Sequence, residues 1–112
     1  MKIISIKENC RFKRLYYKGK SIVKKRIVIY YSKNNLSVNR LGITVSSKIG
    51  NAVTRNRIRR LIRESYRTVS DMKTGFDFVI VARTSAAFSS CEEIKKDIKN
   101  ALTEAKIIQS WK

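Results

Sequence analysis

The stretch that decides the fold runs from Lys48 to Arg67 and reads KIGNAVTRNRIRRLIRESYR. Asn51 is a typical N-terminal cap, and apolar residues recur at helical spacing after it, which predicts a helix over about residues 52–67. The inward stripe of this helix comprises Ile58, Leu61, Ile62, Ser65, Tyr66 and Val69. At about 100° per residue, the side opposite the stripe is almost wholly cationic. It carries Asn56, Arg59, Arg60, Arg63 and Arg67, with Arg55 and Arg57 flanking them.

Strand-forming runs lie on both sides of this helix. Residues 27–31 and 41–46 are rich in β-branched and aromatic side chains and are separated by the turn-forming residues 33–35. A third run, residues 76–82, follows Gly75. Alternation in the second strand places Ile43 and Val45 on one face and Thr44 and Ser46 on the other. One sheet face is therefore expected to be apolar and the other partly open.

Two more helices complete the expected elements. The first covers about residues 8–18, where Phe12, Leu15 and Tyr16 share one face before Gly19. The last begins after two overlapping capping boxes in residues 89–93. Its apolar positions are Ile94, Ile98, Ala101, Leu102 and Ala105. Helices and strands thus share one chain, which predicts an α/β fold.

The size and charge of the chain narrow the function classes. Its 112 residues fit a single domain, residues 1–112, and 43% of them are hydrophobic, which excludes a basic disordered tail. The net charge is +18, and residues 1–67 hold 19 Lys and Arg against 2 Asp and Glu. Such an excess of one sign repels itself unless a polyanion neutralises it.

Several kinds of chemistry are excluded. The chain has no histidine and two cysteines, Cys10 and Cys91, which we expect to be buried and unpaired. We therefore predict no catalytic residues, no metal site and no small-molecule ligand in the protein itself. No stretch is apolar over the length of a membrane span or a secretory signal, so we expect a cytoplasmic protein that contacts no membrane.

The cationic helix favours a nucleic acid partner. A single exposed arginine is usually only solvated, but residues 48–67 carry seven cations and one anion, Glu64. Phosphates spaced along a nucleic acid would relieve this repulsion. A DNA-reading helix would need base-contacting residues at its N-terminus and a dimer surface, and we identify neither. A helix lying on a membrane surface is disfavoured because its apolar stripe is needed for the core.

Aromatic residues point to single-stranded RNA. Phe12 and Tyr16 lie one turn apart, and alternation would place Tyr30 on a strand face with Arg26. Taken alone, these rings fit a hydrophobic core. If the first helix crosses the open side of the sheet, the rings would line a groove together with Thr44 and Ser46. Aromatic faces beside cations suit unstacked bases.

The run from Lys48 to Glu64 resembles the signature of the bacterial ribonuclease P protein family, in which a glycine and an alanine precede an Arg-Asn pair that opens a basic helix. The resemblance extends to Phe12, Tyr16 and Gly19, to a strand ending in Tyr30 and to a late strand ending at Arg83. Two positions depart from the commonest pattern, since Tyr16 replaces a frequent Phe and Arg59 a frequent Lys. Both changes keep the ring or the charge.

The resemblance implies a two-layer α/β (α+β) sandwich, with a mixed sheet of about four strands packed by three helices and a left-handed βαβ crossover. It implies a role in the endoribonuclease that removes the 5′ leader from precursor tRNA, with catalysis and Mg²⁺ belonging mainly to the RNA subunit. The residues expected to hold that RNA are Lys48, Arg55, Asn56, Arg57, Arg59, Arg60, Arg63 and Arg67. Those expected to form the leader cleft are Phe12, Tyr16, Arg26, Tyr30, Thr44 and Ser46. A purely structural RNA-binding protein, such as a ribosomal protein, is the alternative.

Overall fold

Four strands form one mixed sheet in the order β1-β2-β4-β3. The computed structural model describes residues 4–6, 14–16, 19–69 and 72–107. The strands are β1 (Lys20–Val23), β2 (Ile27–Lys33), β3 (Arg40–Thr44) and β4 (Phe76–Ala82). The β1–β2 and β2–β4 pairs are antiparallel and the β3–β4 pair is parallel, so the predicted mixed sheet is confirmed.

The strands differ from the predictions at their ends. β1 was not among the predicted strands, because it lies at a sheet edge and only Ile22 of its four residues is half-buried, which leaves no apolar alternation to detect. β3 begins at Arg40 and ends at Thr44, two residues before the predicted end at Ser46. Ser46 instead caps a short 3₁₀ helix, η1 (Ser47–Ile49).

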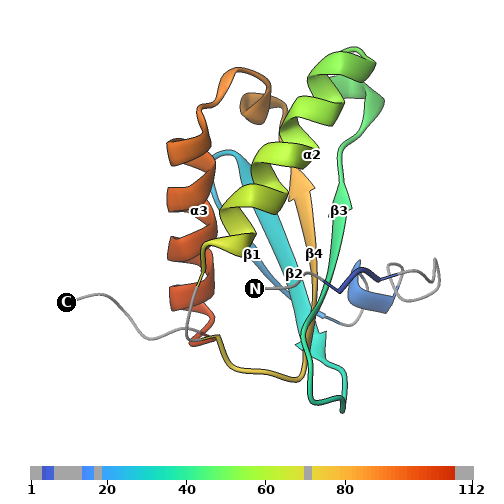
Figure 1. Ribbon diagram of the computed structural model, residues 1–112, viewed down its shortest axis with the longest axis vertical. Helices are drawn as coiled ribbons and strands as arrows, with labels where there is room; N and C mark the ends of the chain where they lie inside the picture. The colour runs from blue at the N-terminus through green and yellow to red at the C-terminus, as the bar shows by residue number, and fades with distance from the viewer. Residues whose placement is uncertain (1–3, 7–13, 17–18, 70–71, 108–112) are drawn as a thin grey trace.

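Two long helices cover one face of the sheet (Figure 1). α2 (Ala52–Arg67) confirms the predicted bounds, and α3 (Cys91–Glu104) begins at the capping box formed by Ser90 and Glu93. Between β4 and α3 lies a 3₁₀ helix, η2 (Thr84–Phe88). The core is formed by the apolar stripes of both helices and the covered face of β2, β3 and β4. Tyr66 lies within it, and burial raises its pKa to about 12, so its hydroxyl stays neutral.

The connection from β3 through α2 to β4 is left-handed. In Figure 1, β3 and β4 run upward, α2 lies in front of the sheet, and β4 stands to the left of β3. Most connections between parallel strands are right-handed, so the left-handed crossover implied by the resemblance is an exception to a strong rule. It brings α2 across the strands that it connects, with its outer face away from the core.

The opposite face of the sheet is covered by the N-terminal part of the chain. Leu15 and Ile6 are buried there against Val79, with Tyr30 packed beside them. Residues 14–16 are helical, in agreement with the predicted first helix, whose other residues lie outside the described ranges. Ser5 pairs with Leu41, which extends the sheet beyond β3.

At Cys91 the prediction of an unpaired thiol is confirmed, but the prediction of burial was wrong, because Cys91 is the exposed first residue of α3. Cys10 lies outside the described residues.

Candidate nucleic-acid interface

The outer face of α2 carries the predicted cations. We call Asn56, Arg59, Arg60, Arg63 and Arg67 the cationic face. Asn51 caps the helix by accepting a hydrogen bond from the Thr54 N–H at 2.9 Å, which fixes where the helix begins. Arg60 and Arg63 are exposed. Arg67 lies 3.7 Å from Glu64, but an ion pair this long at the surface is too weak to neutralise the cationic face. Asn56 accepts a hydrogen bond from Arg59 at 3.0 Å, which orients that guanidinium.

Two of these arginines border a hollow beside the sheet. A depression of about 200 Å³ is lined by Arg59 and Arg63 of α2, by residues 41–43 of β3 and by Ser5 and Ile6. Cationic side chains thus border the β3 edge of the sheet, where Ser5 pairs with Leu41. Arginine forks bind phosphate oxygens in pairs, so the hollow suits a phosphate of a nucleic acid chain. No pattern in the sequence indicates this hollow, because the contact of Ser5 with Leu41 joins segments far apart in the chain.

The flanking residues of α2 differ from the cationic face. The guanidinium of Arg57 donates hydrogen bonds to the backbone carbonyls of Ala87 at 3.4 Å and Ser89 at 2.9 Å, which ties α2 to the η2 segment. Arg55 is half-buried, and its Nε has no hydrogen-bond partner in the described part of the chain. Lys48 is exposed in η1, just before α2. RNA contact by these three residues stays a prediction.

Two tyrosines meet on the open face of the sheet. The rings of Tyr16 and Tyr30 are 5.0 Å apart at 84°, an edge-to-face contact. The Tyr16 hydroxyl is 3.0 Å from Oγ1 of Thr44, so the described helical residues 14–16 lie over this face. We call Tyr16, Tyr30 and Thr44 the tyrosine face. Tyr16 remains exposed and Tyr30 half-buried, which leaves ring surface available to a ligand.

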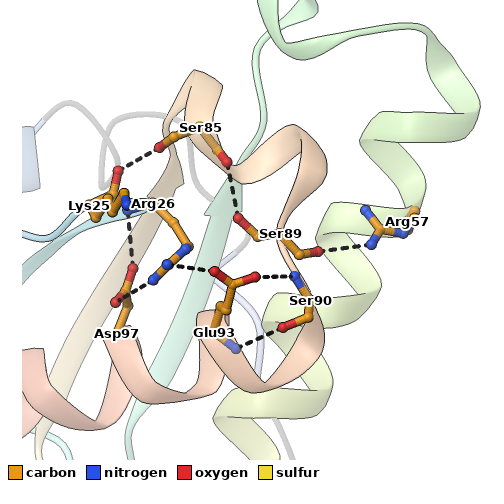
Figure 2. Close-up of polar contacts among 8 residues, drawn as sticks. All are labelled: Lys25, Arg26, Arg57, Ser85, Ser89, Ser90, Glu93 and Asp97. Carbon is orange, nitrogen blue, oxygen red and sulfur yellow. Dashed lines mark hydrogen bonds and ion pairs between the residues drawn. The ribbon is translucent and has the colours of Figure 1, made fainter.

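Arg26 does not join the tyrosine face, so its predicted position was wrong. Figure 2 shows its guanidinium contacting Glu93 and Asp97, both on α3. The distances to the two carboxylates are 2.6 Å and 3.1 Å. Arg26 precedes β2, so strand alternation does not extend to it, and two carboxylates hold its side chain. A hydrogen bond from the Ser90 backbone and the nearby Arg26 cation hold the pKa of Glu93 below its ordinary value.

Two other residues predicted for the cleft are not placed on the tyrosine face. Ser46 lies beyond the end of β3 and is exposed at the start of η1. Phe12 lies outside the described residues. The tyrosine face therefore brings together three of the six residues predicted to bind a single strand.

A buried ion pair that the sequence did not predict joins the beginnings of β3 and β4. Asp77 on β4 is fully buried and accepts two hydrogen bonds of 2.8 Å from the guanidinium of Arg40. Asn34 adds a third at 2.8 Å. These contacts join β4 to β3 and to the loop after β2, so they hold the strands that carry the tyrosine face.

The described residues limit which other sites the protein could contain. Among them, no group of three or more His, Cys, Asp or Glu side chains is placed to hold a metal ion. None of the helices in these ranges has the length and apolar character required to cross a membrane.

Comparison with known proteins gives concordant matches. The family described as Ribonuclease P matches residues 2–106. A ribonuclease P protein component from Clostridium botulinum (strain Loch Maree / Type A3) is 43% identical over 109 residues, covering 96% of this chain and 98% of the relative. The ribonuclease P protein structure from Staphylococcus aureus is similar with a TM-score of 0.85 and 36% identity, covering 96% of this chain and 100% of that one. The one from Thermotoga maritima has a TM-score of 0.78 and 27% identity, covering 86% and 92%.

Proposed function

The chain belongs to the bacterial ribonuclease P protein family, and we propose that it holds the catalytic RNA of this ribonucleoprotein on α2 and the single-stranded 5′ leader of precursor tRNA on the tyrosine face. The observation that carries the proposal is the placement of these two surfaces. The cationic face lies on α2. The tyrosine face is formed by the helical residues 14–16 together with β2 and β3 of the sheet. Two RNA segments could therefore be bound at once.

The cationic face suits a structured RNA. Arg60 and Arg63 are exposed and have no carboxylate beside them among the described ion pairs, so a phosphate could replace water at each. Binding would release counterions from the RNA, which makes the affinity dependent on salt. Arg59 and Arg63 would bind a phosphate at the hollow beside β3.

The tyrosine face suits an unpaired strand. The edge-to-face contact of Tyr16 and Tyr30 orients both rings, and the hydrogen bond of Tyr16 to Thr44 restrains the first of them. Rings held in this way lose little conformational freedom when a base stacks on them. Each stacked base is expected to contribute about 1–3 kcal/mol.

Catalysis is assigned to the RNA. The described part of the protein offers no metal-binding cluster, and the chain has no histidine for general acid–base chemistry. Mg²⁺ bound mainly by the RNA would supply the activated water and stabilise the leaving oxygen. The protein would neutralise charge and position the substrate in the cytoplasm, where tRNA precursors are processed.

Reconstitution tests this function. Protein mixed with candidate RNA subunits and Mg²⁺ should cleave precursor tRNA at the end of the leader and leave a 5′-phosphate on the tRNA. Protein freed of RNA should not cleave. Accurate cleavage by protein alone would refute the assignment of catalysis to the RNA.

Leader-length titration tests the tyrosine face. We expect Tyr30→Ala to reduce the ratio of affinities for precursor tRNA with and without its leader. Tyr31→Ala is the matched control, because Tyr31 is the next residue of β2 and packs against the core on the other face. The ratio cancels any loss of folded protein. An equal effect of both substitutions would contradict the proposal, as would indifference of the wild type to the leader, which a ribosomal protein should show.

A further inference from the structure

Phe88 is an exposed aromatic residue that the two proposed RNA surfaces do not use. It ends η2 and its side chain is 96% exposed, the largest value among the exposed large apolar residues in the described ranges. Exposed apolar residues are common at protein surfaces, so exposure alone indicates nothing. The backbone around Phe88, however, is held from several directions.

Hydrogen bonds fix the chain on both sides of this ring. Arg57 donates to the carbonyls of Ala87 and Ser89, the two neighbours of Phe88. The Ser89 hydroxyl donates to the Ser85 carbonyl at 3.0 Å, and the Ser85 hydroxyl donates to the carbonyl of Lys25. Figure 2 shows this connection from α2 through the η2 segment to the turn before β2. Ser89 is also buried, so the segment cannot shift without breaking these contacts.

Cationic residues lie on the segments next to Phe88. The Arg57 guanidinium lies against the backbone on both sides of Phe88, and Arg83, the exposed N-cap of η2, donates to the Lys24 carbonyl. η1, which carries the exposed Lys48, packs against η2. The first turn of α3 carries two carboxylates, Glu93 and the exposed Glu92, of which Glu93 is paired with Arg26. A flat apolar ring on a restrained backbone suits an unpaired base, because the ring can stack while the exposed cations Lys48 and Arg83 on the adjoining segments attract the phosphates.

We propose that Phe88 is a stacking site for an unpaired base of the RNA partner, separate from the tyrosine face and presented by the segment that Arg57 braces. The proposal rests on the RNA-binding function above. Since the ring is already exposed and its backbone fixed, binding orders little of the protein.

The test compares Phe88→Ala and Phe88→Trp with the wild type in titrations of the RNA subunit and of precursor tRNA bound to the holoenzyme. Phe88→Ala should weaken one of these affinities by roughly 5- to 150-fold, and Phe88→Trp should restore it. The dependence of affinity on salt should not change, because no cation is removed. Leu36→Ala is the control, since Leu36 is also exposed but lies in the loop after β2, at the other end of the sheet.

A second readout reports stacking directly. With Trp111, the only tryptophan, replaced by Phe, the fluorescence of Phe88→Trp should be quenched when the RNA binds. If the wild type binds RNA and Phe88→Ala binds it with the same affinities, the stacking proposal is overturned but the proposed function stands. Failure of the wild type to bind RNA would overturn the function itself. A change in sedimentation of Phe88→Ala with unchanged RNA affinity would assign the ring to a protein contact and also overturn the proposal.

Discussion

The two hydrogen bonds from Arg57 to the η2 segment lead to a prediction that separates bracing from RNA contact. We expect Arg57→Gln to lower the free energy of unfolding, because its guanidinium bonds to the Ser89 carbonyl at 2.9 Å and to the Ala87 carbonyl at 3.4 Å. A hydrogen bond from a charged donor contributes about 1.5–3 kcal/mol, and the longer of the two bonds adds little. Arg57 is half-buried, which places the expected loss near the lower end, about 1.5–2 kcal/mol. In a domain of this size that lowers Tm by roughly 5–10 °C.

Arg60→Gln is the matched control, because Arg60 lies one turn further along α2 but is exposed on the cationic face. Its loss should change the free energy of unfolding by less than about 0.5 kcal/mol. It should instead reduce the slope of log affinity for the RNA subunit against log salt by about 0.7–0.9, one phosphate contact. Arg57→Gln should leave that slope unchanged under conditions where the protein is folded.

Urea unfolding and RNA titrations at several salt concentrations measure both quantities on the same variants. The reasoning would be refuted if Arg57→Gln kept the wild-type urea midpoint and lost as much salt dependence as Arg60→Gln. Arg57 would then be an RNA contact, as its place in the sequence first predicts.

Three further changes test the scaffold. Asp77→Asn should lower the free energy of unfolding in urea by about 3–5 kcal/mol, because it breaks a buried ion pair with Arg40; a loss below 1 kcal/mol would contradict this. Gly75→Ala should cost about 1–3 kcal/mol by the same assay, because Gly75 has φ +92° and an added Cβ would lie 3.1 Å from the Leu36 carbonyl oxygen; an unchanged urea midpoint would show that the turn adapts. The lowered pKa of Glu93 contributes stability that is present above its ordinary value of 4.5 and lost as pH falls through the folded value. The stability advantage of the wild type over Glu93→Gln should therefore shrink below pH 4.5, and an advantage that persisted in acid would count against stabilisation of the Glu93 carboxylate by Ser90 and Arg26.

The spacing of apolar residues predicted the helices and strands that bury many apolar side chains. The bounds of α2 and β4 match the predictions because the sequence supplies a cap at Asn51, a turn at Gly75 and apolar residues at the spacing of one face. β1 carries only one half-buried side chain, so the hydrogen bonds of its neighbour β2, rather than an apolar pattern, decide that it is a strand.

Side chains were likewise predicted correctly where local geometry decides their position and incorrectly where long-range contacts decide it. Arg60 and Arg63 are exposed as predicted, since helical geometry fixes the direction of a side chain from its position alone. Strand alternation predicts Arg26 beside Tyr30, but its guanidinium pairs with carboxylates of α3. Arg57 donates to backbone carbonyls at the end of η2, and its contact with RNA stays a prediction. Their partners are Glu93, Asp97 and backbone carbonyls between residues 87 and 89, all more than 25 positions away in the chain.

The sequence by itself predicted one basic domain, and it determined that α2 presents exposed arginines outward and that its signature resembles the ribonuclease P protein family. These features follow from composition, local spacing and motif. Only the tertiary structure decided which cations remain available to RNA, where Tyr16 meets Tyr30 and Thr44, and that Phe88 stands exposed on a braced segment. Those outcomes depend on contacts between distant segments. A long, flexible arginine side chain takes the nearest acceptor that folding brings to it, and the local pattern of the chain does not contain that information.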